Sequence, residues 1–209
     1  MDILFLLFTG FTIGLSGAMI PGPLTFFTVS ETLRTDKHAG IRVMGGHILV
    51  ELAIVMVIVL GFKSLLLSRA LLFAISVTGG IAFVVMGALL LRNAGKFTLK
   101  GIEPDEHVRK KAVVGGALFS VTSPGFIIWW ATIGVSTLLE ASMAGVAGVV
   151  TLVAGHWLAD IVWYGSISYA VEKGKVYLND KRYRTAICLL SFLLIVLGVY
   201  FLLKGLFLR

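Results

Sequence analysis

The sequence has a single cysteine, Cys188, among its 209 residues. This excludes a disulfide within the chain and any thiol chemistry that needs two cysteines. Charge is also scarce, because Asp, Glu, Lys and Arg make up 14% of the chain, whereas a soluble domain usually carries about 25%. Apolar residues make up 58%. This composition is not typical of a soluble protein.

Long stretches of the chain contain no residue that carries charge near neutral pH. Asp, Glu, Lys, Arg and His are absent from residues 3–30, 70–91, 112–139 and 185–203. Residues 43–62 and 141–171 each contain one His and one carboxylate. A helix needs about 20 apolar residues to cross a bilayer. The sequence therefore predicts an all-α membrane protein with six transmembrane helices, as a single membrane domain over residues 1–209.

No segment between these stretches is long enough to fold alone. The longest connection, at about residues 93–111, is too short for an independent domain. We interpret the net charge of +7 as connection charge that sets orientation, and we expect no nucleic-acid partner. The expected partners are the lipid bilayer and a small molecule, and no cofactor is expected. Any function must therefore be carried by helices in or at the membrane.

Lys and Arg alternate between the two sides of the predicted spans. Fourteen of the eighteen lie in the first, third and fifth connections: Arg34, Lys37, Arg42, Arg92, Lys96, Lys100, Arg109, Lys110, Lys111, Lys173, Lys175, Lys181, Arg182 and Arg184. Cytoplasmic connections carry the excess of these residues in membrane proteins. The pattern predicts a multi-pass protein of the cell membrane with both termini outside.

The two halves of the chain repeat two features in the same order. The first and fourth spans contain Pro21-Gly22-Pro23 and Ser123-Pro124-Gly125 within uncharged runs. The second and fifth spans share the pattern Gly-His-x-Leu-x-acid at residues 46–51 and 155–160. A duplication kept only for packing is one interpretation of this similarity.

An inverted repeat is the other interpretation, and we favour it. Since each half has three spans, the second half must enter the membrane from the opposite side. We predict repeats at about 1–92 and about 112–209, joined by a cytoplasmic loop at about 93–111. Inverted repeats are a recurring plan of secondary transporters, whose sites lie at the repeat interface.

Glu51 and Asp160 lie at the centres of the second and fifth spans, where a carboxylate costs at least about 2.5–3.5 kcal/mol to insert. No Lys or Arg lies in any predicted span to pair with them. Such acids can exchange protons or accept a substrate's ammonium group, and a structural hydrogen bond is the alternative. His47 and His156 each precede an acid by four residues, on the same helix face. They could bind substrate, relay protons or only orient the acids.

These four residues also permit a different site. His47, Glu51, His156 and Asp160 could together hold a divalent ion. No thiolate is available to help, and the His-Glu-x-x-His sequence of zinc proteases is absent. The main prediction therefore includes no metal, and the metal site is kept as an alternative.

Proline lacks a backbone N–H, so the first and fourth helices should kink or break. Backbone groups freed within lipid must find partners or line a cavity. The residues predicted to line the site at these breaks are Pro21, Gly22, Pro23, Ser123, Pro124 and Gly125. A broken helix can also act as a hinge, although a static kink is the alternative.

In the second half of the chain, aromatic residues follow both the predicted helix break and the central acid. Trp129 and Trp130 follow the second break, and Trp163 and Tyr164 follow Asp160. One of these rings could face an ammonium group through a cation–π contact. Packing is the favoured interpretation, because Trp is common in membrane helices for that reason.

Gly10 and Gly14 form a Gly-x-x-x-Gly pattern in the first span. This pattern lets two helices approach closely. It could seat a neighbouring helix or a second subunit of a homo-oligomer.

The segment from Gly14 to Pro23, Gly-Leu-Ser-Gly-Ala-Met-Ile-Pro-Gly-Pro, resembles the N-terminal signature of the LysE-type (lysine exporter, RhtB-like) amino-acid translocator family. The six-span layout is similar too, so the resemblance covers the whole chain. Family members often have Asn-Pro and then aromatic residues in the fourth span, where this chain has Ser123-Pro124 and Trp129-Trp130. An acid in the fifth span, here Asp160, is also similar.

The resemblance implies a secondary active transporter that exports amino acids or related amines from the cytoplasm, by antiport with protons or another ion. Relatives in the wider superfamily move manganese or cadmium, so a divalent metal ion exporter is the alternative. A membrane-embedded enzyme is the second alternative. It is not favoured, because the chain lacks a Gly-x-Ser-x-Gly elbow.

Overall fold

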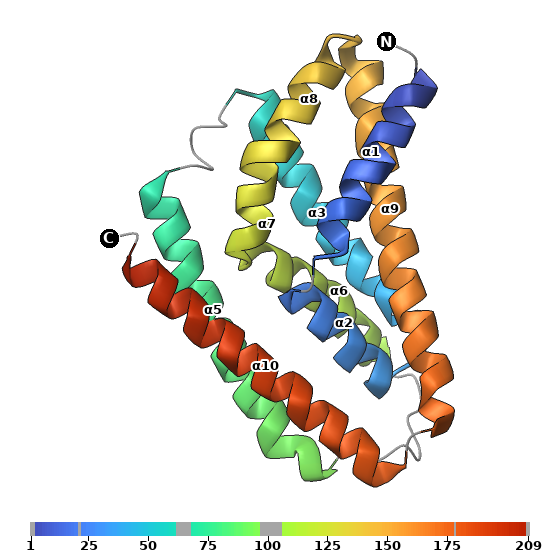
Figure 1. The fold of residues 1–209 in the computed structure, drawn as a ribbon, viewed down its shortest axis with the longest axis vertical. Coiled ribbons are helices and arrows are strands. Elements are labelled where there is room, and N and C mark those ends of the chain that lie inside the picture. The colour runs from blue at the N-terminus through green and yellow to red at the C-terminus, as the bar shows by residue number, and fades with distance from the viewer. Residues whose placement is uncertain (1–2, 21, 62–67, 97–105, 178, 208–209) are drawn as a thin grey trace.

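The computed structural model describes residues 3–20, 22–61, 68–96, 106–177 and 179–207. Every regular element in these ranges is a helix (Figure 1). The all-α membrane fold predicted from the apolar runs is therefore confirmed.

The helices in chain order are α1 (Ile3–Ala18), α2 (Pro23–Arg34), α3 (Ala39–Val59), α5 (Arg69–Asn93), α6 (Glu106–Val121), α7 (Pro124–Trp129), the π-helical turn η2 (Trp130–Gly134), α8 (Val135–Ser142), α9 (Gly145–Gly174) and α10 (Asp180–Leu206). Short 3₁₀ turns, η1 (Ala94–Lys96) and η3 (Lys175–Tyr177), follow α5 and α9. Five stretches are long and apolar enough to cross a membrane: α3, α5, α7 to α8, α9 and α10. α1 and α2, bent by 80° to each other, make a sixth when taken as one broken span.

Both predicted helix breaks are present. α2 begins with Pro23 at its first position after the extended Gly22, and α7 begins with Pro124 after the extended Ser123. Proline is well suited to a first helical turn, because the N–H it lacks would have no partner there. Each proline therefore starts a new helix. Pro21 lies outside the described residues.

Two helix pairs pack closely through glycines in matching places. α1 packs against α9, where Gly10 faces the carbonyl of Leu152. α3 packs against α6, where Gly116 of α6 faces the carbonyl of Val43. A Cβ atom on either glycine would overlap that carbonyl, so only glycine allows this approach. The glycines of the α1 pattern are thus used against a neighbouring helix of the same chain.

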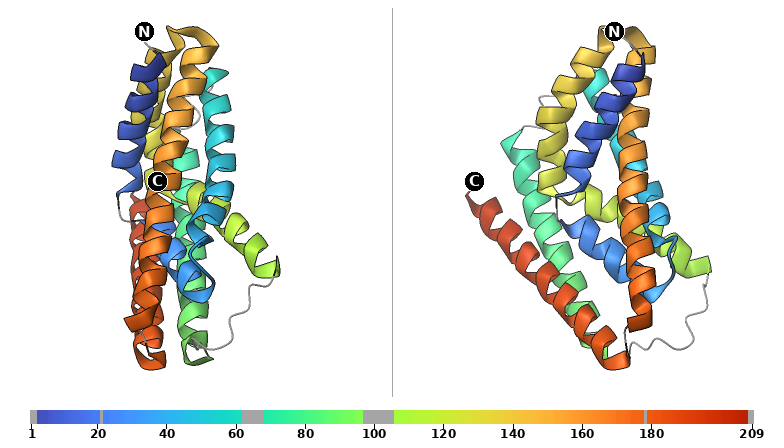
Figure 2. Two further views of the ribbon diagram at one scale, coloured as in Figure 1. Left: turned by 90° about the vertical axis from the view of Figure 1, so that its right-hand side faces the viewer. Right: turned by 45° about the vertical axis from the view of Figure 1, so that its right-hand side comes forward.

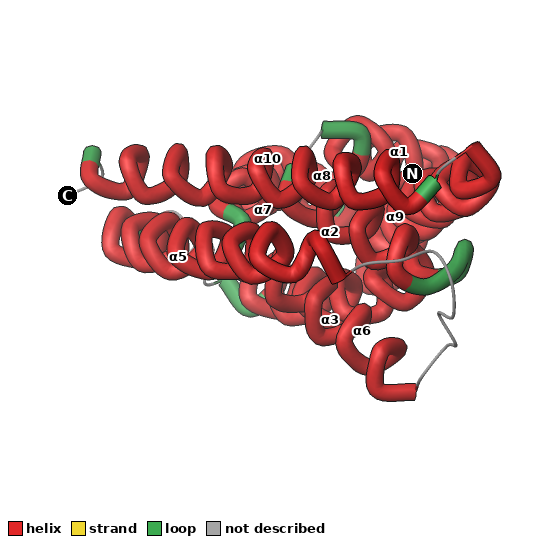
Figure 3. Tube along the Cα trace, turned by 90° about the horizontal axis from the view of Figure 1, so that it is seen from below, coloured by secondary structure: helices red, strands yellow, loops and turns green. Residues whose placement is uncertain are grey.

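α5 and α10 form a separate antiparallel pair beside these helices. Figure 3 shows the pair from below. Aromatic rings join the pair to the rest of the molecule: Phe83 of α5 stacks on Phe119 of α6 at 5.3 Å and lies 5.7 Å from Phe201 of α10. Near the other end, the hydroxyl of Tyr183 donates to the carbonyl of Leu33 at 3.1 Å. These contacts bring one face of α10 against the centre of the molecule.

Two of the connections that carry positive charge lie at the same end of the molecule. The α2–α3 and α9–α10 connections lie at the lower end in Figure 1, and Lys175 donates to the carbonyl of Thr35 there at 3.1 Å. The α8–α9 connection lies at the opposite end, beside the N-terminus (Figure 2). Which end faces the cytoplasm stays a prediction from the charge pattern.

Replacing Gly46 of α3 tests the close packing. A Cβ at this position would overlap the carbonyl of Val113, so we expect Gly46→Ala to destabilise the protein by about 1–3 kcal/mol. Gly45→Ala is the matched control, because its Cβ would meet only a methyl group of Val113 at 3.9 Å. Thermal unfolding of both variants in detergent gives the comparison. Equal unfolding temperatures for the two variants would contradict the packing described.

Candidate functional site

A cavity of about 280 Å³ lies at the level of the two helix breaks. Its lining comes from α1, α2, α3, α6, α7, η2, α9 and α10 and from the breaks themselves. The residues are Gly17, Ala18, Ile20, Gly22, Pro23, Leu24, His47, Glu51, Phe119, Ser120, Ser123, Gly125, Phe126, Trp129, Trp130, His156, Asp160, Tyr164, Leu197 and Phe201. Most of these are apolar or aromatic, so the charged and imidazole groups among them stand out.

Four of the residues singled out in the sequence converge in this cavity. His47 and Glu51 come from one face of α3, and His156 and Asp160 from one face of α9. All four are buried, with Glu51 1% and Asp160 2% exposed. α3 and α9 are far apart in the sequence. The packing of α3 on α6 and of α9 on α1 places the two faces that carry these residues toward each other.

Glu51 has more close polar contacts than Asp160. Its Oε1 atom lies 3.0 Å from His156 Nε2 and 3.2 Å from His47 Nε2. The indole Nε1–H of Trp130 donates to the same oxygen at 3.1 Å. The other oxygen, Oε2, has no hydrogen-bond partner among the described residues. Three nitrogen atoms thus meet at one oxygen of Glu51.

The helix break explains why Trp130 reaches Glu51. α7 starts beside the cavity at Pro124, and the chain passes into the π-helical turn η2 at Trp130. Such turns occur often at functional sites, since they shift the direction of side chains relative to a regular α-helix. The indole is 3% exposed and packs in the apolar cluster between α1, α3 and α9.

Ser120 holds His47 at the nitrogen that faces away from Glu51. The Ser120 oxygen lies 2.6 Å from His47 Nδ1 and 2.7 Å from the carbonyl oxygen of Gly116. A serine hydroxyl has one proton, which it can donate to either of these two acceptors. The contact with Nδ1 orients the imidazole so that Nε2 lies toward Glu51.

Asp160 is arranged differently from Glu51. Its nearest basic atoms are His156 Nε2 at 3.4 Å and His47 Nε2 at 3.9 Å. Oδ2 is buried and accepts no hydrogen bond from the described residues. An unpaired oxygen of this kind, facing a cavity, is poised to bind a ligand or a proton.

The predicted break residues do not all reach the cavity. Gly22, Pro23, Ser123 and Gly125 line it, whereas Pro124 is buried behind it. The hydroxyl of Ser123 caps α7 by accepting from the backbone N–H of Phe126 at 3.5 Å.

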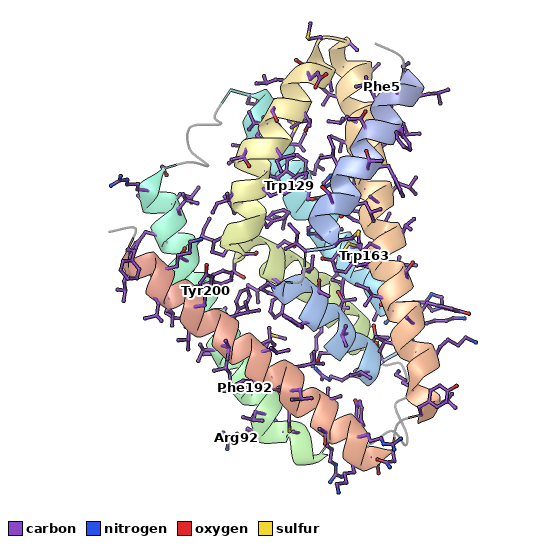
Figure 4. All side chains as sticks on the ribbon, viewed as in Figure 1. Phe5, Arg92, Trp129, Trp163, Phe192 and Tyr200 are labelled. Carbon is purple, nitrogen blue, oxygen red and sulfur yellow. The ribbon has the colours of Figure 1, made fainter. Side chains whose placement is uncertain are left out.

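The predicted aromatic contacts likewise do not all reach the cavity. Trp129 and Trp130 line the cavity, and the Trp129 ring packs against Gly17 of α1 (Figure 4). Trp163 is not a lining residue and packs in an apolar cluster, whereas its neighbour Tyr164 does line the cavity. Helical spacing gives the reason, since Tyr164 follows Asp160 by four residues and shares its face.

Sequence analysis did not identify several lining residues. Ser120, Phe119 and Phe126 lie on either side of the second break, and Leu197 and Phe201 belong to α10. The spacing of Leu197 and Phe201 marks one helix face, but nothing in an all-apolar helix shows which face meets the site. Ser120 could have been noticed as a polar residue shortly before the break.

The cluster has the chemical groups for a metal ion. One ligand atom each of His47, Glu51 and Asp160 lie within 4.8 Å of one another. Imidazole and carboxylate ligands suit several divalent ions.

One known protein family matches this chain over most of its length. The model of the LysE type translocator family matches residues 15–205. The chain belongs to this family. No curated protein and no solved structure matches it. The protein is therefore a multi-pass membrane translocator, and the resemblance seen at Pro-Gly-Pro is confirmed.

Removing the indole N–H tests the hydrogen bond to Glu51. Trp130→Phe takes one donor from a buried carboxylate, so we expect the translocator to lose about 1–3 kcal/mol of stability. Trp157→Phe is the control, because the Nε1 of Trp157 is buried without a hydrogen-bond partner. Thermal unfolding in detergent ranks the two variants. A larger loss for Trp157→Phe would show that the Trp130 bond contributes nothing.

Proposed function

We propose that this translocator exports amino acids or related amines from the cytoplasm across the cell membrane. The observation that carries the proposal is a cavity that combines buried carboxylates with aromatic and apolar walls. Carboxylates attract an ammonium group, and apolar walls suit a side chain. A cavity of about 280 Å³ has room for an organic solute with several heavy atoms, which a bare ion does not need.

We further propose that the chain is an inverted repeat that works by alternating access. The matching glycine contacts support this: Gly10 and Gly155 in the α1–α9 pair correspond to Gly116 and Gly46 in the α3–α6 pair. In this mechanism the two halves rock about the central site. α1–α2 and α6–α7 hinge at Pro23 and Pro124, where each helix is already interrupted.

Proton exchange would complete the transport cycle. The substrate enters from the cytoplasm, its ammonium meets an acid of the cluster, and its carboxylate meets backbone amides at the breaks. Protons taken up from outside then reset the carrier. The chain of contacts from Ser120 through His47 to Glu51 gives a proton several adjacent positions within an otherwise apolar region.

A divalent metal exporter is the second candidate, and the grouping of three potential ligands favours it. One ligand atom each of His47, Glu51 and Asp160 lie within 4.8 Å of one another. Imidazole and carboxylate ligands suit several divalent ions. Ser120 also holds His47 by Nδ1, as an outer ligand partner would.

A membrane-embedded enzyme has weaker support. Ser120, His47 and Glu51 are in contact in the order of a catalytic triad. However, the Ser120 oxygen also lies 2.7 Å from the carbonyl oxygen of Gly116, which competes with the imidazole for the single hydroxyl proton. This competition makes Ser120 a weaker nucleophile, because the imidazole must take that proton.

Counterflow into proteoliposomes distinguishes the two transport functions. We expect labelled amino acids to exchange, and we expect Glu51→Gln and Asp160→Asn each to lower the rate at least about tenfold, since each changes a charged contact in the cavity. Manganese and cadmium are assayed beside the amino acids. Metal flux without amino-acid exchange would reject the first candidate and select the second. Normal exchange by both variants would contradict the mechanism.

A proton gradient provides a separate test of coupling. We expect acidification of the outer side to accelerate amino-acid export, because protons taken up there reset the carrier. A protonophore should remove this acceleration and leave counterflow unchanged, since counterflow needs no gradient. Export that is insensitive to the gradient would show that another ion, or none, is coupled.

A further inference from the structure

The two acids of the cavity differ in how much of their charge is already paired. Glu51 Oε1 is within 3.2 Å of three nitrogen atoms, from His47, His156 and Trp130. Asp160 Oδ2 has no hydrogen-bond partner among the described residues, and the imidazole nitrogen nearest to it is 3.4 Å away. Glu51 Oε2 has no partner there either, but three nitrogen atoms already surround Oε1 of the same carboxylate. Asp160 therefore has more capacity for a cationic partner than Glu51.

The sequence explains this difference. Pro23 and Pro124 each begin the helix that follows a break, so Val29 of α2 occupies the place that Trp130 occupies after α7. An indole N–H therefore reaches Glu51 from the second half. Valine offers no such donor to Asp160 from the first half.

Glu51 is the other carboxylate among the lining residues that the structure describes. Apart from the acid and histidine cluster, the lining is glycine, proline, two serines and apolar or aromatic residues, among them Phe126, Trp129, Tyr164, Leu197 and Phe201. A cation in the cavity beyond the reach of Asp160 would have near it only ring faces and Glu51, which already has three nitrogen atoms around one oxygen. A cation–π contact replaces only part of what a carboxylate supplies.

From these observations we propose that Asp160 binds the single cationic group of the substrate, and that the substrate is an amino acid or amine with one ammonium group and an apolar side chain. This inference rests on the proposed function. Glu51 then acts as a positioning residue, which holds the two imidazoles and Trp130 around the cavity. A diamine such as lysine fits poorly, because the other carboxylate available to its second ammonium, Glu51, is already paired with the imidazoles and Trp130.

Counterflow with three probes tests the substrate class. The probes are L-leucine, its 2-hydroxy analogue (which lacks the ammonium group) and L-lysine. We expect wild-type protein to exchange leucine at least about tenfold faster than lysine at equal concentration, since a buried charged contact contributes about this factor. Exchange of lysine as fast as leucine would overturn the inference and leave amino-acid export intact. Exchange of manganese or cadmium but of no amino acid would instead overturn the proposed function.

Variants then assign the ammonium contact to one acid. We expect Asp160→Asn to lower the ratio of leucine to hydroxy-analogue exchange about tenfold, because the analogue has no cation to lose. Glu51→Gln should slow both probes and leave their ratio unchanged. Glu140→Gln, at an exposed acid of α8 that does not line the cavity, controls for the exchange of acid for amide.

The ratio can also be measured without transport. If Asp160→Asn exchanges too slowly, the rise in unfolding temperature caused by each probe in detergent gives the same comparison. A variant at Glu51 that changes the ratio more than Asp160→Asn would overturn the assignment of the cation to Asp160.

Discussion

Burial of two carboxylates in a membrane bundle constrains the rest of this structure. Water is not available in lipid to solvate such groups, so their charge must be met by protein, by protons or by a ligand. Within the part of the chain that the structure describes, neither Lys nor Arg lines the cavity around Glu51 and Asp160, and two imidazoles and one indole lie closest to them. The bundle is arranged so that these few donors reach the acids.

The glycine contacts supply that arrangement. α3 can present His47 and Glu51 at the centre only because Gly46 and Gly116 let it lie directly on α6. The same holds for α9, where Gly155 lies against α1. The breaks then separate α2 from α1 and α7 from α6, and the cavity lies at the level of the breaks, with α10 as a further wall. The close packing at the glycines and the cavity at the prolines thus together place the acids at the centre of the molecule.

Much of the fold follows from simple features of the sequence. Charge-free runs predict the spans because lipid excludes charge, and Pro23 and Pro124 predict the breaks because proline cannot continue a hydrogen-bonded helix. The grouping of the acids and histidines also follows from their shared pattern. What the sequence does not predict is which of several similar residues turn inward. Tyr164 is an exception, because its four-residue spacing from Asp160 places it on the face that lines the cavity. Leu197 and Phe201 lie in an all-apolar helix, and only contact with neighbouring helices decides that they line the cavity.

The differences between the halves matter more for function than their similarity. Ser120 of α6 holds His47, while the matching position in α1 is Gly14, which lies against His156 and has no side chain to bond it. Trp130 donates to Glu51, while Val29 offers nothing to Asp160. A perfectly symmetric site would bind a cation equally at both acids. In the proposed inverted repeat, these few differences pair one acid with protein groups and leave the other more open, so two similar halves would form a site that binds its substrate in one orientation.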